Sequence, residues 1–128
     1  MQEEQDLENA DYKTLRGWAL SYPETVEEFP WGHSAIKVRK KAFVFLSCTK
    51  EALSLSVKLP QSSEAAITLT DAVPTGYGLG KYGWVSCKFA PTDQIPHEML
   101  RAWVDESYRA IAPKRLSKGV PEGGPAAA

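Results

Sequence analysis

Apolar residues near the start of the chain recur three and four positions apart, with polar residues between them. This spacing is typical of an amphipathic helix and predicts one from Asn9 or Ala10 to Ser21. Pro23 ends the helix, because the residue before a proline disfavours the helical conformation. We expect residues 24–34 to form an ordered loop whose two aromatic side chains lie in the core.

The period of the pattern changes to two after residue 34. Alternation predicts strands at 35–40 and 41–49, joined by a tight turn near Arg39-Lys40-Lys41, and further strands at 53–59 and 84–90. One face of these strands is apolar, as in Val85, Cys87 and Phe89. The opposite face is expected to carry Lys37, Arg39, Ser54, Ser56, Lys58, Trp84, Ser86 and Lys88. A tryptophan among lysines on a solvent-facing sheet is unusual and marks this surface for attention.

Two further helices complete the pattern. The pattern after Pro60 predicts a short helix at residues 64–69. A long helix is predicted to begin at Pro96 and to end before Pro113. The apolar residues of the long helix form one stripe at a spacing of 3.6. The order is helix, three strands, short helix, strand and long C-terminal helix. It predicts a single compact α+β domain in which helices pack on one face of an antiparallel sheet.

Length and composition agree with one globular domain. The chain has 128 residues, of which 43% are hydrophobic and 24% charged, so it can bury a core without a metal or a disulfide. A net charge of -1 excludes a histone-like polycation and a disordered acidic chaperone. No apolar stretch has the length of a membrane span, and no signal-peptide core follows the acidic start. We therefore expect a cytoplasmic monomer that does not bind membranes.

Charge is distributed unevenly along the chain. Residues 1–28 hold eight acids and two bases, whereas residues 37–88 hold eight bases and three acids. A neutral protein can therefore present one positive face. Residues 1–7 are expected to be an acidic flexible terminus. Residues 117–128 are expected to be a flexible tail rich in Gly, Pro and Ala.

Catalytic patterns are weak. The glycines between residues 76 and 83 do not match a phosphate-binding loop, because Gly80-Lys81 lacks the following Ser or Thr. The two histidines and the two cysteines form no metal-binding signature. Asp105 and Glu106 are adjacent on a helix and therefore diverge by about 100°. We expect a domain that is not an enzyme and needs no metal or cofactor.

Three short motifs in a fixed order carry a family resemblance: Phe29-Pro30-Trp31-Gly32-His33, Gly80-Lys81-Tyr82-Gly83-Trp84-Val85, and Asp105-Glu106-Ser107-Tyr108-Arg109 followed by Ala112-Pro113-Lys114-Arg115. Together they resemble the MmcQ/YjbR family over residues 8–116. The resemblance implies a CyaY-like fold, sometimes called a double-wing arrangement, a DNA-binding label and no catalytic set. It marks His33, Lys81, Trp84, Ser107 and Tyr108 as positions to test.

Three functions are consistent with these observations. The first is weak, salt-sensitive DNA binding by the open sheet face and its hairpin, with Trp84 or Tyr82 stacking on a base and phosphate contacts from Lys37, Arg39, Lys40, Lys41, Lys58, Lys81 and Lys88. The second is a pocket for a small acidic or aromatic ligand at the Trp31–His33 turn and the Gly80–Trp84 loop, with Lys81, Trp84, Ser107 and Tyr108 as further lining candidates. The third is a protein-interaction surface on the same sheet face.

Overall fold

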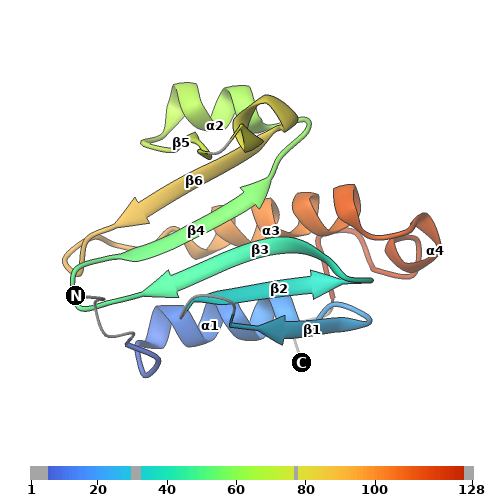
Figure 1. Cartoon of the computed structure of the whole chain (residues 1–128), viewed down its shortest axis with the longest axis horizontal. Helices are drawn as coiled ribbons and strands as arrows, with labels where there is room; N and C mark the ends of the chain where they lie inside the picture. The colour runs from blue at the N-terminus through green and yellow to red at the C-terminus, as the bar shows by residue number, and fades with distance from the viewer. Residues whose placement is uncertain (1–5, 30–32, 77, 126–128) are drawn as a thin grey trace.

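A six-stranded antiparallel sheet forms the centre of the molecule (Figure 1). A computed structural model describes residues 6–29, 33–76 and 78–125 of the chain. The order of strands across the sheet is β1-β2-β3-β4-β6-β5. The strands are β1 (Thr25–Glu28), β2 (Ser34–Val38), β3 (Lys41–Cys48), β4 (Leu53–Lys58), β5 (Val73–Pro74) and β6 (Trp84–Phe89).

Two long helices cover one face of this sheet. Helices α1 (Ala10–Leu20) and α3 (His97–Ile111) pack against each other and against β3 (Figure 1). Helix α2 (Ser63–Leu69) packs beside β5 and β6, where the 3-10 turn η1 (Leu79–Tyr82) also lies. This arrangement confirms the predicted α+β domain with an antiparallel sheet and helices on one face. None of the helices in the described part of the chain is long and apolar enough to cross a bilayer.

Two strands of the sheet escaped prediction. The segment expected to be a loop contains β1, which pairs with β2 so that Val26 lies opposite Lys37. Strand β5 has two residues and pairs with β6. Four and two residues are too few to establish a period in the sequence. The expectation of a buried Phe29 is also wrong, because its side chain is 51% exposed just beyond the edge strand β1.

Alternation along the strands divides the sheet into a covered face and an open face. Leu53, Leu55 and Val57 of β4 are buried beneath the helices, whereas the residues between them are only partly covered. A register shift between β2 and β3 leaves Phe43 without a direct partner. Its ring packs edge-on against Tyr108, with ring centroids 5.2 Å apart. The bulge therefore anchors the long helix to the middle of the sheet.

The C-terminal segment differs from the predicted flexible tail between residues 117 and 125. It follows helix α4 (Lys114–Ser117) and is held by Arg109, whose guanidinium donates hydrogen bonds to the carbonyls of Ser117, Val120 and Pro121. Val120 is buried in the core cluster. Gly124 lies so close to Trp18 that a Cβ there would come within 2.5 Å of the indole. The segment has a composition typical of flexible tails, but three of its carbonyls accept hydrogen bonds from Arg109 and Val120 packs in the core.

Candidate functional site

The open face of the sheet carries a row of rings and a row of hydroxyls. Phe45 lies between His33 and Trp84, with ring centroids 6.2 and 5.5 Å away. Ser56 and Ser86 lie opposite each other on β4 and β6, and their hydroxyls are hydrogen-bonded at 2.7 Å. The two motifs around His33 and Trp84, which are 51 residues apart in sequence, therefore meet on one surface.

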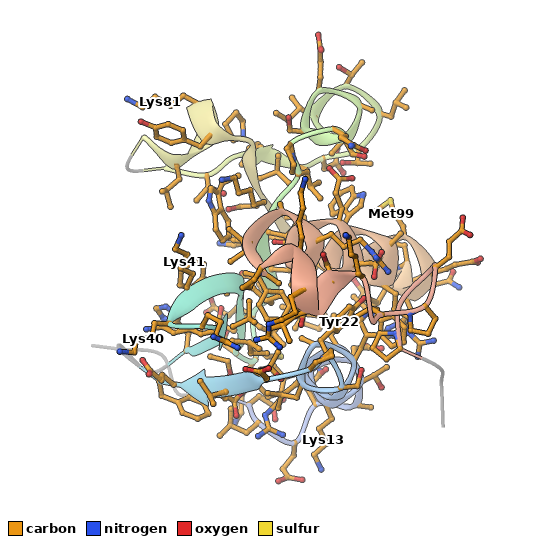
Figure 2. All side chains as sticks on the ribbon, turned by 90° about the vertical axis from the view of Figure 1, so that its right-hand side faces the viewer. Lys13, Tyr22, Lys40, Lys41, Lys81 and Met99 are labelled. Carbon is orange, nitrogen blue, oxygen red and sulfur yellow. The ribbon has the colours of Figure 1, made fainter. Side chains whose placement is uncertain are left out.

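Four lysines lie along one end of the sheet, and we call them the basic end: Lys40, Lys41, Lys58 and Lys81. Lys40 lies in the β2–β3 turn and Lys41 starts β3. Lys58 ends β4 opposite Trp84, and Lys81 precedes that tryptophan by three residues. Figure 2 shows Lys40, Lys41 and Lys81 on the side of the molecule away from α3. Across residues 6–29, 33–76 and 78–125, no carboxylate lies within 4.0 Å of any of these four ammonium groups.

The remaining cations named from the sequence are placed differently. Lys37 forms an ion pair with Glu28 at 2.8 Å, and Arg39 pairs with Glu24 at the same distance. Both carboxylates come from β1 or the turn before it, which the sequence pattern did not identify as a neighbour of β2. Lys88 lies at the far end of β6. The predicted set of seven cations therefore separates into the basic end, two neutralised side chains and one remote lysine.

The turn that presents Lys40 has an unusual backbone. Two residues, Arg39 and Lys40, connect Val38 to its partner Lys41, and their φ angles are 51° and 71°. A two-residue hairpin turn with both φ angles positive favours Asn-Gly, because a Cβ is crowded in this conformation. Backbone strain of this kind costs roughly 1 kcal/mol or more per residue. Arg39 and Lys40 therefore occupy two positions at which Asn and Gly would be more stable.

Trp84 is not the solvent-facing ring expected from the sequence. It lies on the open face, but its side chain is only 7% exposed beside Phe45. Tyr82 in η1 is 59% exposed, and the Lys81 ammonium lies 5.3 Å from the centre of its ring. Of the two aromatic residues considered for stacking, Tyr82 is therefore the accessible one.

Ser107 and Tyr108 do not line a pocket with Trp84, because both are fully buried on the covered face. The Ser107 hydroxyl donates to the carbonyl of Phe43 and accepts from the backbone N–H of Lys58 at 2.9 Å. The Tyr108 hydroxyl donates to the carbonyl of Pro23, and burial raises the pKa of this phenol. These motif residues hold α3 to the sheet.

The adjacent carboxylates of α3 diverge as predicted. Asp105 accepts hydrogen bonds from Tyr22 and Arg109, whereas Glu106 accepts the backbone N–H groups of Gln61 and Ser62. Burial, followed by the bond to Asp105, raises the pKa of Tyr22 above its ordinary value. Each carboxylate therefore joins a different part of the chain to α3. No pattern in the sequence indicates these partners.

The ligand pocket predicted from the two motifs is only partly described. Trp31 lies outside the described residues, so its part in that pocket is not placed. His33 and Trp84 lie on either side of Phe45, and Lys81 is exposed with its ammonium over the ring of Tyr82. These residues share the open face with the basic end, whereas Ser107 and Tyr108 do not.

The nucleophile candidates are in environments that keep them protonated. Burial raises the pKa of the Cys87 thiol to about 12. Burial and the nearby charges of Asp6 and Asp11 also raise the pKa of Cys48. A protonated thiol is a weak nucleophile. Within the described ranges, no group of three or more His, Cys, Asp or Glu side chains is arranged to hold a metal ion.

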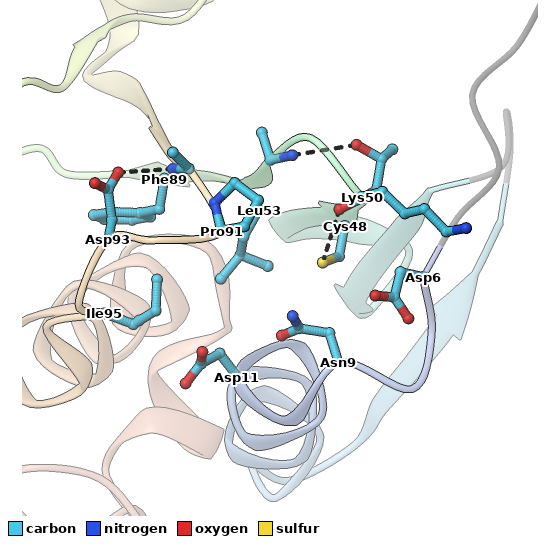
Figure 3. Close-up of a pocket in the computed structure, with 13 residues that line it drawn as sticks. Asp6, Asn9, Asp11, Cys48, Lys50, Leu53, Phe89, Pro91, Asp93 and Ile95 are labelled. Atoms are coloured by element: carbon cyan, nitrogen blue, oxygen red, sulfur yellow. Dashed lines mark hydrogen bonds between the residues drawn. The ribbon is translucent and has the colours of Figure 1, made fainter.

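A small acidic hollow lies at the opposite end of the sheet from the basic end. Figure 3 shows Asp6, Asn9, Asp11 and Cys48 around it. Its volume of about 80 Å³ has room for water but not for a drug-sized ligand. Asp11 pairs with His97 at 2.6 Å, and the Asn9 side chain caps α1 by accepting from the N–H of Tyr12. These polar groups hold the N-terminal segment and α1 in place.

A comparison with protein families supports the motifs that suggested the resemblance. No curated protein matches the chain significantly. The family model YjbR matches residues 20–110, a span that contains all six strands of the sheet, the basic end and α3 up to Ala110. Because this match covers well over half of the 128 residues, the chain belongs to the YjbR family.

Proposed function

We propose that this domain is a binding protein for nucleic acid and that the basic end contacts the phosphate backbone. One observation carries the proposal. Lys40 and Lys41 at the β2–β3 turn, Lys58 on β4 and Lys81 in η1 come from three segments to one end of an open sheet, without a described carboxylate within 4.0 Å of them. Exposed lysines scattered for solubility need no such convergence. A cluster of this kind suits a polyanion.

The strained turn and the exposed ring of the basic end add support. Arg39 and Lys40 occupy a turn in which Asn-Gly is favoured, and backbone strain of this kind often occurs at functional sites. Tyr82 offers an accessible face beside Lys81 on which a base can stack. Phosphate contacts of this type read no sequence directly, so we expect little sequence preference.

A helix that reads the major groove is not part of this proposal. The cations in the body of α3 are engaged on the covered side. The Arg101 guanidinium lies over Trp18 at 5.2 Å, and Arg109 holds Asp105 and the C-terminal carbonyls. The net charge of -1 also predicts weak binding with a strong dependence on salt.

We further propose a non-enzymatic role in the cytoplasm, with the domain acting as a monomer. The raised pKa values of Cys48 and Cys87 support the non-enzymatic role, because they keep both thiols protonated and only the thiolate is a good nucleophile.

Titration of fluorescent single- and double-stranded DNA at about 50 and 200 mM salt tests the proposal. The variant Lys41→Glu with Lys81→Glu changes two exposed members of the basic end. It should lower affinity at the lower salt about tenfold or more and reduce the salt slope by about two. Lys37 is a poorer probe, because Glu28 already neutralises it.

A control with the same change in charge separates the site from net charge. Lys13 lies on α1, apart from Lys40, Lys41 and Lys81 (Figure 2), and Lys50 lies beside the acidic hollow at the opposite end of the sheet (Figure 3). Lys13→Glu with Lys50→Glu should leave affinity within about twofold of the wild type. Equal losses in the two double variants, or no binding by the wild type at 50 mM salt, would refute the proposal.

A further inference from the structure

A groove beside helix α3 opens on the side of the molecule away from the basic end. It has a volume of about 430 Å³, within the range of small-molecule sites. Its floor is apolar and formed by Ala72, Cys87, Phe89, Met99 and Trp103. In Figure 2, Met99 lies on the opposite side from Lys40 and Lys41. The groove is therefore independent of the proposed nucleic-acid surface.

The floor of the groove is apolar and contains two aromatic residues, Phe89 and Trp103. Ala72 and Trp103 are 3% and 7% exposed, and Met99 and Phe89 pack against the same core. Cys87 is partly exposed to the groove, and burial raises the pKa of its thiol to about 12. A thioether and two aromatic rings provide favourable contacts for a flat apolar group.

The rim of the groove carries more negative than positive charge. Asp71 and Asp93 stand on it with a single cation, Lys88. In the part of the chain that the structure describes, neither carboxylate has a cationic nitrogen within 4.0 Å. Both acids are thus available to a ligand.

Hydrogen bonds fix the backbone around both acids. Asp93 accepts from the N–H of Ala90 at 2.7 Å and donates its own N–H to the Ala90 carbonyl. Thr70 accepts from the N–H of Ala72 at 3.0 Å, which closes the turn that contains Asp71. A preorganised rim of this kind lowers the cost of ordering on binding.

We propose that this groove binds a small molecule with a flat apolar or aromatic body and a protonated amine. The body lies on Met99 and Trp103, and the ammonium group lies between Asp71 and Asp93. An anionic ligand is disfavoured by the two carboxylates, and a neutral ligand gains only the apolar contacts.

Methionine labelling gives a direct readout of the groove. The chain contains two methionines, Met1 and Met99, so the second methyl resonance in a carbon-13 spectrum reports on the floor. The probes are 1-naphthylmethylamine, 1-naphthylmethanol and 1-naphthylacetate, which share a ring system and differ in charge. The amine should shift the Met99 resonance saturably and bind about fivefold more tightly than the alcohol, and the acid should bind most weakly.

Rim variants test the assigned roles without altering the reporter. Asp71→Asn with Asp93→Asn should reduce the affinity for the amine to that for the alcohol, because both negative charges are removed. The backbone of the rim should be unchanged, because the asparagine oxygen at position 93 can still accept from Ala90 N–H. Lys88→Gln should raise the affinity for the amine about twofold by removing the single rim cation. The proposal fails if no probe shifts Met99 saturably. It also fails if the amine and the alcohol bind equally to the wild type, or if the acid binds best.

Discussion

Polar side chains are buried and hydrogen-bonded on one face of the sheet and mostly exposed on the other. On the covered face, the hydroxyls of Ser107 and Tyr108 are fully buried, and each is hydrogen-bonded to the backbone of a distant segment. On the open face, Lys40, Lys41 and Lys81 are exposed and Lys58 is half-buried, and none of them has a described carboxylate within 4.0 Å. Residues of the family motifs occur on both faces. Membership of a motif therefore does not distinguish a binding residue from a structural one.

The difference lies in what each side chain would lose if it were changed. A buried hydroxyl that satisfies two backbone groups contributes to stability, because its removal leaves those groups unpaired. An exposed ammonium without a partner contributes little to stability. Stability and binding should therefore respond to separate sets of substitutions, one set on each face.

The largest effect should come from Ser107→Ala. The change removes the acceptor for Lys58 N–H and the donor to the Phe43 carbonyl in a buried position. We expect a loss of about 2 kcal/mol in the free energy of unfolding, measured in urea, because two buried backbone groups lose their partner.

The same change on the open face provides the control. Ser56 is hydrogen-bonded to Ser86, but the pair is only partly buried, so water can replace the missing hydroxyl. Ser56→Ala should cost less than about 1 kcal/mol. Equal losses at Ser107 and Ser56 would mean that burial does not distinguish the two faces.

The strong periods in the sequence predicted the main architecture. The apolar stripe of α3 and the alternation of β4 and β6 were sufficient to assign both helices and strands, because many consecutive residues carry the same pattern. Strand β1 was missed because four residues define no period. The placement of the C-terminal segment was missed because it depends on hydrogen bonds from Arg109 and on contact between Gly124 and Trp18, which is distant in sequence.

The candidate site was predictable in its composition but not in its geometry. Alternation placed Lys58 and Trp84 on one face, and the structure agrees. It could not indicate that Trp84 is covered, or that Glu28 neutralises Lys37 from an unpredicted strand. The groove beside α3 was also not visible, since its floor and rim come from three separate segments. Contacts between such segments have no signature in a single sequence.

The next effect separates stability from binding at one turn. Replacing Arg39-Lys40 with Asn-Gly should relieve the strain of two positive φ angles. It also removes the exposed ion pair with Glu24, which contributes little. We expect a net gain of about 1 kcal/mol in stability and a loss of about threefold in DNA affinity at 50 mM salt. A gain in both quantities would show that these cations take no part in binding.

A smaller effect on stability should come from the Cys87 thiol, on the covered face, at alkaline pH. The Cys87 thiol has an ordinary pKa of 9.0 in the unfolded chain and a pKa of about 12 in the folded one. Above pH 9 the unfolded state therefore binds fewer protons, and stability falls as the pH rises towards 12. Between pH 8 and 10 the wild type should lose about 1 kcal/mol more than Cys87→Ala in urea unfolding. Tyr22 and Tyr108 shift in the same direction and cancel in this comparison. Parallel pH profiles for the two proteins would place the thiol in contact with water.

The smallest effect on stability should come from the basic end itself. Lys41→Gln and Lys81→Gln remove charge from exposed side chains without a described carboxylate nearby, so no ion pair is lost. Self-repulsion among the four lysines also decreases slightly. Each variant should unfold within about 0.5 kcal/mol of the wild type, while its affinity for DNA at 50 mM salt falls severalfold. If either lysine instead stabilises the fold by 1 kcal/mol or more, it has a structural partner, and the distinction between the two faces does not hold at that position.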